Sequence, residues 1–124
     1  MKVAVIGDGG WGTALALTLR RNGCAPCVWG PDAGYIEEIR RTRRNRKFLP
    51  GVELPEEVAW TAEAADALDG AEAVAVVVPS RYMRGVLERL AGAYRSAGAP
   101  PVLSATKGFD EATRERMTEL VAEV

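Results

Sequence analysis

The chain has 124 residues, of which 48% are hydrophobic and 27% charged, a composition typical of one ordinary globular domain and not of a disordered, fibrous or membrane-embedded chain. Its 16 basic and 17 acidic residues leave a net charge of −1, so the charge balance gives no reason to expect a nucleic acid or an anionic membrane as a partner. With two cysteines, no secretion signal and no apolar run long enough to span a bilayer, we expect a cytoplasmic protein without membrane insertion.

Strand and helix signals alternate from the first residues onward. Residues 3–6 are an apolar, β-rich run, and residues 10–22 carry apolar side chains at helical spacing up to an Asn-Gly pair that is typical of a helix end. A second strand is expected at residues 28–30, followed by a helix that opens at Pro31-Asp32. These elements predict the order β-α-β-α.

The remaining elements continue the alternation after a polar, basic loop. A short strand at 58–60 precedes a small helix at 62–68 that Thr61 can cap, and the apolar run 73–78 is typical of a central parallel strand buried on both faces. The last expected elements are a helix headed by Ser80, a strand at 101–105 and an amphipathic helix at 110–124. This alternation predicts an α/β fold, a Rossmann-like doubly wound parallel sheet whose ligands lie beyond the carboxyl ends of its strands.

A glycine-rich turn carries the strongest functional signal. Residues 7–12, Gly-Asp-Gly-Gly-Trp-Gly, satisfy G-x-G-x-x-G between an expected strand and an expected helix. In such a turn Gly7 permits the tight bend, Gly9 lets a diphosphate approach the backbone, and Gly12 lets the helix pack on the sheet. The amides of Gly10, Trp11 and Gly12 at the positive end of the helix dipole would bind the anion. The alternative is a turn that serves packing alone, but its flanking elements favour a site for NAD or NADP.

Asp32 allows two interpretations. It lies twenty residues after Gly12, about where a ribose-binding acid is expected in a dinucleotide fold. It also lies two residues beyond the expected strand, where an aspartate commonly caps a helix. Both roles remain open from the sequence.

Four short strings, taken together, resemble one enzyme family. They are GDGGWGTALA at 7–16, NRKFLPG at 45–51, VPS at 78–80 and TKG at 106–108. In order and spacing they resemble bacterial NAD(P)-dependent glycerol-3-phosphate dehydrogenase, and the resemblance covers the whole chain. It implies that residues 1–124 are an NAD(P)-binding Rossmann domain, incomplete before a helical substrate domain that would carry the general acid–base lysine, so that no catalytic residue lies in this chain.

The same resemblance implies a reaction and a set of binding residues. The intact enzyme would transfer a hydride reversibly between the nicotinamide and dihydroxyacetone phosphate, giving sn-glycerol 3-phosphate for phospholipid synthesis, and would be compatible with a homodimer. Gly10 and Trp11 would contact the cofactor, and Pro31 would lie beside the adenosine ribose. Tyr82 would fill the aromatic position after the Val-Pro-Ser turn, and Lys107 would be shared between cofactor and substrate phosphate. A lysine just past a strand's carboxyl end suits that role, the alternative being a solvated loop lysine.

Three features depart from the family or leave a choice. Asp8 stands where the family usually has alanine, and its carboxylate would repel phosphates unless the side chain points away, so we expect Asp8→Ala to bind NADH or NADPH at least as tightly as the parent. Pro31 offers no charge to a 2′-phosphate, which leaves the choice between NAD and NADP open. The basic run from Arg40 to Lys47 is either a solvated face or a helper in holding phosphates.

Two other functions remain compatible with the residues. One is a free-standing NAD(H)-binding module that senses redox state without chemistry. The other is a different two-domain hydroxy-acid dehydrogenase, which would share the fold and differ downstream. A redox or metal role for the Cys-x-x-Cys sequence at 24–27 is disfavoured, because it does not begin a helix and no histidine or second cysteine pair could complete a zinc site.

Overall fold

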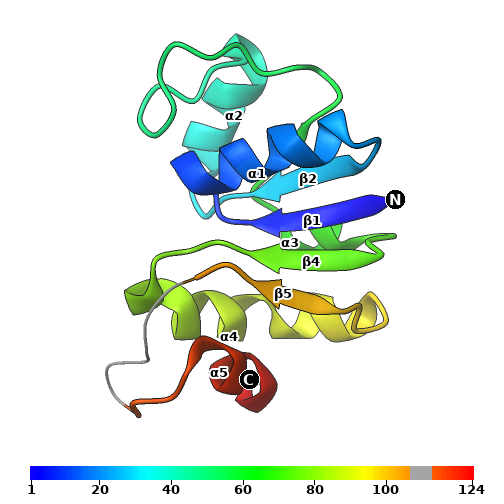
Figure 1. The fold of residues 1–124 in the computed structure, drawn as a ribbon, viewed down its shortest axis with the longest axis vertical. Coiled ribbons are helices and arrows are strands. Elements are labelled where there is room, and N and C mark those ends of the chain that lie inside the picture. The colour runs from blue at the N-terminus through cyan, green and yellow to red at the C-terminus, as the bar shows by residue number, and fades with distance from the viewer. Residues whose placement is uncertain (107–112) are drawn as a thin grey trace.

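The computed structural model describes residues 1–106 and 113–124, and these residues form one parallel sheet with helices on both sides (Figure 1). Across the described residues the strand order is β3-β2-β1-β4-β5, and every neighbouring pair is parallel. The strands are β1 (Lys2–Ile6), β2 (Ala25–Trp29), β3 (Ala59–Thr61), β4 (Ala73–Val76) and β5 (Val102–Ser104). The helices are α1 (Gly10–Arg21), α2 (Ala33–Thr42), α3 (Ala64–Leu68), α4 (Ser80–Ser96) and α5 (Met117–Glu123).

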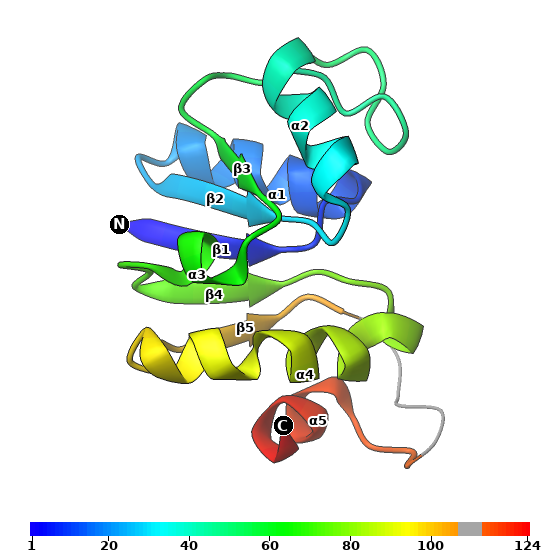
Figure 2. The ribbon, with the colours of Figure 1, turned by 180° about the vertical axis from the view of Figure 1, so that it is seen from behind.

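The strand order reverses between β1 and β4, which lie side by side in the sheet (Figure 1). From β1 the chain moves outward through β2 to β3, and it then returns to place β4 and β5 on the other side of β1. Helix α1 covers one face, whereas α3 and α4 cover the other, as the view from behind shows (Figure 2). The predicted Rossmann-like doubly wound sheet is therefore confirmed, and its switch point lies where β1 and β4 end.

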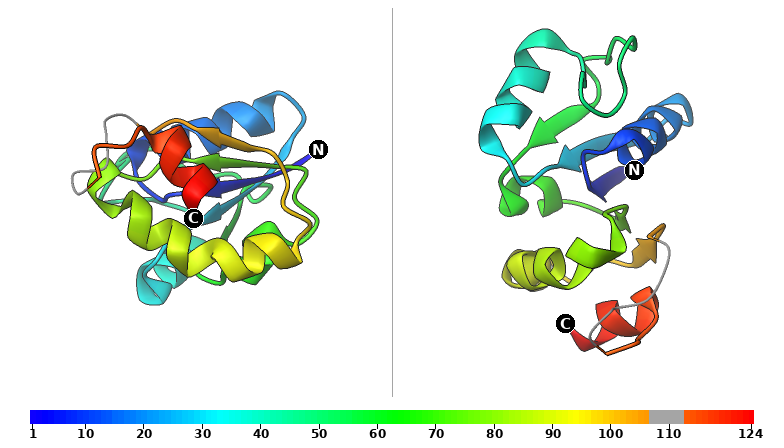
Figure 3. Two further views of the ribbon diagram at one scale, coloured as in Figure 1. Left: turned by 90° about the horizontal axis from the view of Figure 1, so that it is seen from below. Right: turned by 90° about the vertical axis from the view of Figure 1, so that its left-hand side faces the viewer.

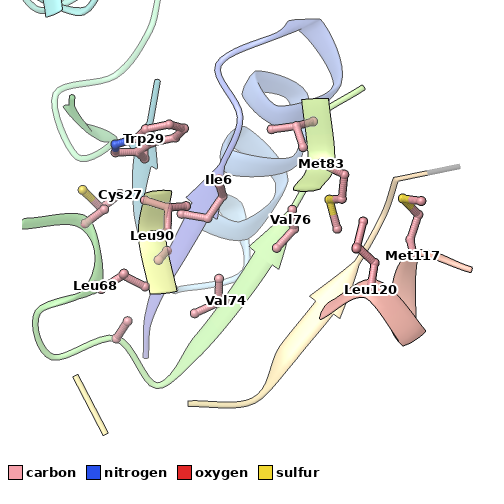
Figure 4. Packing of buried hydrophobic residues seen from close by; sticks show 14 residues of the cluster. Ile6, Cys27, Trp29, Leu68, Val74, Val76, Met83, Leu90, Met117 and Leu120 are labelled. Carbon is pink, nitrogen blue, oxygen red and sulfur yellow. The ribbon is translucent and has the colours of Figure 1, made fainter. Parts of the chain in front are cut away.

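Alternate residues of β1, β2 and β4 pack into two separate cores. Val3 and Val5 pack into the cluster that also holds Ala16 of α1 and two isoleucines of α2. Ile6, with Ala4, faces the second cluster, to which α3, α4 and α5 contribute. Figure 4 shows that second cluster, where Met117 and Leu120 of α5 approach the sheet beside Val76. Complete burial of one such side chain contributes about 1.5–3 kcal/mol, so the two cores supply most of the driving force for folding.

Some element boundaries differ from the sequence prediction. Helix α3 begins at Ala64 instead of 62, because the hydroxyl of Thr61 accepts a hydrogen bond from the Glu63 amide (3.0 Å) and does not cap a longer helix. Strand β4 ends at Val76, although residues 77 and 78 remain buried. Strand β2 begins three residues earlier than expected.

The last helix is shorter than the sequence predicted. We expected a helix over 110–124, but residues 110–112 lie outside the described residues and residues 113–116 are not helical. Helix α5 begins at Met117, where the side chain of Glu119 accepts a hydrogen bond from the Arg116 amide (3.3 Å). Figure 3 shows α5 beside α4, at the opposite end of the molecule from α2. No helix in the described part of the chain is long and apolar enough to cross a membrane.

Candidate functional site

The glycine-rich turn begins directly after β1, at the switch point of the sheet. Gly7 has a φ of 131°, and its amide donates a hydrogen bond to the carbonyl oxygen of Trp29 (3.0 Å). A Cβ added at Gly7 would lie 2.6 Å from the carbonyl oxygen of Val77, in the segment that follows β4. Both its conformation and this close approach therefore require glycine at position 7.

Two further glycines are required by packing alone. A Cβ at Gly12 would overlap the carbonyl oxygen of Gly7, so that helix α1 could not lie as close to the turn. A Cβ at Gly10 would lie 2.6 Å from the carbonyl oxygen of Phe48, in the loop after α2. The helix and this loop thus hold the turn from two sides.

Gly9 differs from the other glycines of the turn. Its φ of −72° is accessible to any residue, and an added Cβ would meet no heavy atom of the described residues within 4 Å. Neither conformation nor packing within the described structure therefore calls for glycine here. A bare backbone facing open space is what a closely approaching ligand needs, and this observation speaks against a turn that serves packing alone.

The amino end of α1 presents unpaired backbone donors to the same space. Gly9 is the N-cap residue, and no side chain among the described residues caps the helix. The first helical bond is donated by the Thr13 amide to the carbonyl of Gly9 (3.0 Å), which leaves the amides of Gly10, Trp11 and Gly12 without an intrahelical acceptor. These donors and the positive end of the helix dipole could hold an anion such as a diphosphate.

Asn45 links the loop after α2 to the glycine-rich turn, a residue that sequence reasoning did not single out. It is 0% exposed, and its side-chain amide donates to the carbonyl oxygen of Asp8 (2.8 Å) and to the hydroxyl of Thr13 (2.9 Å). Its side-chain oxygen accepts hydrogen bonds from the Tyr35 hydroxyl and from the Phe48 amide. The only signal in the sequence was its place at the start of the string at 45–51. Because every polar atom of this buried amide is used, Asn45 fixes where the turn lies.

The side chains of the basic run from Arg40 to Lys47 have different partners and point in different directions. Arg43 donates to the carbonyl oxygen of Val58 (3.1 Å), and Arg40 lies 3.9 Å from the carboxylate of Glu37. Lys47 lies over the ring of Tyr35, 4.9 Å from its centre, and its charge acts on Asp8. Part of the run is therefore structural or solvated, and Lys47 is the member whose charge reaches the turn.

The side chain of Asp8 points towards the end of β2. Its carboxyl carbon would lie 2.7 Å from a Cβ placed on Gly30. Burial raises the pKa of this carboxyl and the charge of Asp32 raises it further, whereas a hydrogen bond from its own amide and the charge of Lys47 lower it. The carboxylate thus lies beside the end of β2, in a setting that disfavours negative charge.

The other described residues expected at the site lie at the same edge of the sheet. Asp32 is the N-cap of α2, where its carboxylate accepts a hydrogen bond from the Tyr35 amide (3.1 Å), so the capping role is confirmed. Pro31 is exposed next to it. Tyr82 lies in the first turn of α4 and is 54% exposed. Lys107 lies outside the described residues, but Thr106 is tied to the turn after β4 by a hydrogen bond from its hydroxyl to the Val78 carbonyl (2.8 Å).

The two cysteines show no arrangement for redox or metal chemistry. Both are free thiols, and burial raises the pKa of Cys27, which disfavours the reactive thiolate. Within residues 1–106 and 113–124, no group of three or more His, Cys, Asp or Glu side chains could hold a metal ion. The glycine-rich turn is therefore the candidate site that the chain's geometry favours.

A parallel sheet with its switch point at a glycine turn and an uncapped helix defines a nucleotide-binding domain of the Rossmann class. The model of the family described as NAD-dependent glycerol-3-phosphate dehydrogenase N-terminus matches residues 2–124. The chain belongs to this family.

Comparison with individual proteins agrees with that family. The chain is 41% identical to glycerol-3-phosphate dehydrogenase [NAD(P)+] 2 of Sphingopyxis alaskensis, covering 100% of this chain and 36% of the relative. Identity with glycerol-3-phosphate dehydrogenase [NAD(P)+] of Enterococcus faecalis is 38%, over 98% of this chain and 35% of the relative. The crystal structure of glycerol-3-phosphate dehydrogenase from Coxiella burnetii matches with a TM-score of 0.86 and 27% identity, covering 98% of this chain and 37% of that one. The chain thus spans little more than a third of these relatives.

Proposed function

We propose that residues 1–124 are the cofactor-binding domain of an NAD(P)-dependent glycerol-3-phosphate dehydrogenase that works in the cytoplasm. The reaction is the reversible transfer of a hydride between the nicotinamide and dihydroxyacetone phosphate or sn-glycerol 3-phosphate, a step of glycerophospholipid synthesis. Membership in the family supports the reaction. The observation that carries the binding role is the bare backbone of Gly9, open to a ligand in front of an uncapped helix.

The residues of this chain bind and orient the cofactor, which itself supplies the hydride. The amides of Gly10, Trp11 and Gly12 hold the diphosphate, and Gly7 and Gly9 let it approach the backbone. Pro31 and Asp32 lie beside the adenosine ribose, and Tyr82 lies towards the nicotinamide end. Lys107 contributes its ammonium to the cofactor and to the substrate phosphate. This assignment agrees with the position of the described members of the set at the carboxyl edge of the sheet.

The general acid–base lysine belongs, in this proposal, to a helical domain that follows residue 124. The chain alone then binds NADH or NADPH but does not oxidise it in the presence of dihydroxyacetone phosphate. Absorbance at 340 nm follows that oxidation directly, and turnover by residues 1–124 would contradict the placement of the catalytic group. A small molecule is the partner of the site, and the complete enzyme is compatible with a homodimer.

The variant Gly9→Ser tests the binding role. A serine at this N-cap position can cap α1 with its own hydroxyl, so the fold should be kept while the diphosphate loses its place. We expect NADH to bind at least tenfold more weakly, measured by titration of tryptophan fluorescence. Gly92→Ser on the exposed side of α4 is the matched control, because a side chain there also meets open space. Binding by Gly9→Ser as tight as by the parent would contradict the proposal.

A further inference from the structure

Between the end of β2 and Asp32, this chain has no polar side chain that could supply the acid for the adenosine ribose. In Rossmann domains this acid projects from the end of the second strand. Here β2 ends at Trp29, and Gly30 and Pro31 follow it. Asp32, the next residue, uses a carboxylate oxygen to cap α2.

The carboxylate of Asp8 fills the space that a side chain at position 30 would enter. A Cβ on Gly30 would lie 2.7 Å from the carboxyl carbon of Asp8 and 2.8 Å from the terminal methyl carbon of Ile36. The backbone of Gly30 is held by a hydrogen bond from its amide to the carbonyl oxygen of Thr61 (3.1 Å). The φ angle of Gly30 is not positive, so the backbone conformation at this position does not require glycine. Position 30 is therefore kept bare by the presence of Asp8 and Ile36, and a carboxylate from the turn lies at the end of β2.

Near the carboxylate of Asp8, negative charges outnumber positive ones. Asp8 and Asp32 contribute two carboxylates, and Lys47 contributes one ammonium, which lies over the ring of Tyr35. Tyr35 itself donates its hydroxyl to Asn45, so it brings no charge. A 2′-phosphate would add up to two negative charges beside two carboxylates, whereas a ribose hydroxyl adds none.

We propose that Asp8 determines the cofactor preference of this chain: its carboxylate at the end of β2 excludes the 2′-phosphate, so NAD(H) binds in preference to NADP(H). The inference rests on the proposed function, because it assumes that the dinucleotide lies across the glycine-rich turn. Asp32 strengthens the exclusion, and Lys47 weakens it. Asp8 thus acts as a repulsive element against one cofactor, placed on the turn instead of on the strand.

Dissociation constants for NADH and NADPH, measured by tryptophan fluorescence titration on the parent and on Asp8→Asn, test this assignment. We expect the parent to bind NADH at least tenfold more tightly than NADPH. Asp8→Asn should raise the affinity for NADPH relative to NADH at least tenfold. The matched control is Glu56→Gln, which removes an exposed carboxylate elsewhere and should leave the ratio as it is in the parent.

A second pair of variants protects the test against a folding defect. Asp32→Asn keeps a good N-cap residue and removes the other charge, so it should shift the ratio in the same direction by a smaller factor. Lys47→Gln should shift it in the opposite direction. A parent that prefers NADPH, or an Asp8→Asn variant that leaves the ratio unchanged, would overturn the role of Asp8 while NADH binding upholds the proposed function. A folded parent that binds neither dinucleotide would overturn both.

Discussion

The two ends of the sheet are stabilised in different ways. Around β1 and β2, backbone atoms approach one another so closely that three glycines of the turn have a steric reason, and the buried Asn45 is hydrogen-bonded through its whole amide. Around β4 and β5, apolar contact dominates. Leu103 in β5 is 66% exposed, and a cavity of about 470 Å³ lies between β4, α4 and α5. The end with the candidate site is thus held by close backbone packing and buried hydrogen bonds, whereas the other end is held mainly by apolar burial.

Helix α5 illustrates the second kind of stabilisation. It has 7 residues, too few to be stable by itself, and its buried contacts are made by Met117 and Leu120. Its outer side is tied by exposed polar contacts, such as a hydrogen bond from Arg95 to the carbonyl oxygen of Val124 (2.9 Å). Such contacts contribute little, so docking of α5 depends on its apolar side chains, above all the buried Met117 and Leu120.

The largest effect should come from Gly12→Ala, at the tightest contact of the site end. Because its Cβ would overlap the Gly7 carbonyl oxygen, α1 or the turn must shift, and we expect a loss of about 3 kcal/mol in the free energy of unfolding. Urea denaturation measures this loss, and NADH binding should disappear with it. A destabilisation below about 1 kcal/mol would show that the turn can adjust to the added methyl group, and that the close contact with Gly7 does not require glycine.

Asn45→Ala should be the next most disruptive change. It removes the donor to the Asp8 carbonyl oxygen and one of the two partners of the Thr13 hydroxyl, and we expect a loss of about 2–3 kcal/mol. Tyr35→Phe removes only one hydroxyl of the same network and should cost about 1 kcal/mol. Both values come from urea denaturation. Equal effects of the two variants would mean that the network does not centre on Asn45.

At the other end, Leu120→Ala should cost about 2 kcal/mol, because it removes a fully buried side chain from the face of α5 that contacts the core. The dissociation constant of NADH should stay that of the parent, because the core cluster that holds Leu120 includes no residue of the glycine-rich turn. Fluorescence titration beside urea denaturation checks both parts. A loss of nucleotide affinity would show that the two ends are coupled.

Asp8→Asn should stabilise the chain at neutral pH by a few degrees in Tm. Burial raises the pKa of Asp8 above its ordinary value of 3.8, so the folded state holds the proton more tightly than the unfolded state does. Ionisation of Asp8 therefore destabilises the folded state relative to the unfolded state as the pH rises above 3.8. The gain of the neutral variant should vanish below pH 3.8, where the carboxyl is protonated in both states. Thermal melts across pH measure it, and a gain that persists in acid would contradict the cause.

The smallest effect on stability should come from Leu103→Lys. The side chain is mostly exposed, so the free energy of unfolding should change by less than about 0.5 kcal/mol. A charge on β5 should reduce self-association of the chain, because exposed apolar strand residues promote it. Sedimentation velocity over a range of concentrations measures the self-association of the parent and the variant. Equal self-association of the two would indicate that β5 does not mediate it.

Local patterns were sufficient to predict the order of elements and to single out the glycine-rich turn as the candidate site. The apolar run 73–78, the helical spacing after Gly10 and the turn at 7–12 each reflect a physical preference that acts within a few residues. Parallel pairing and the switch point then followed, because a chain that alternates strands and helices has few ways to cover both faces of a sheet.

Tertiary structure decided what the patterns left open. Only the folded chain shows that Asp8 points to Gly30, that Asn45 holds a turn 37 residues earlier in the chain, and that α5 starts at Met117. It also shows that Asp32 caps α2, a choice the sequence left undecided. The physical reason is that side-chain direction, burial and hydrogen bonding depend on neighbours brought together by folding, whereas periodicity and turn chemistry depend on neighbours along the chain.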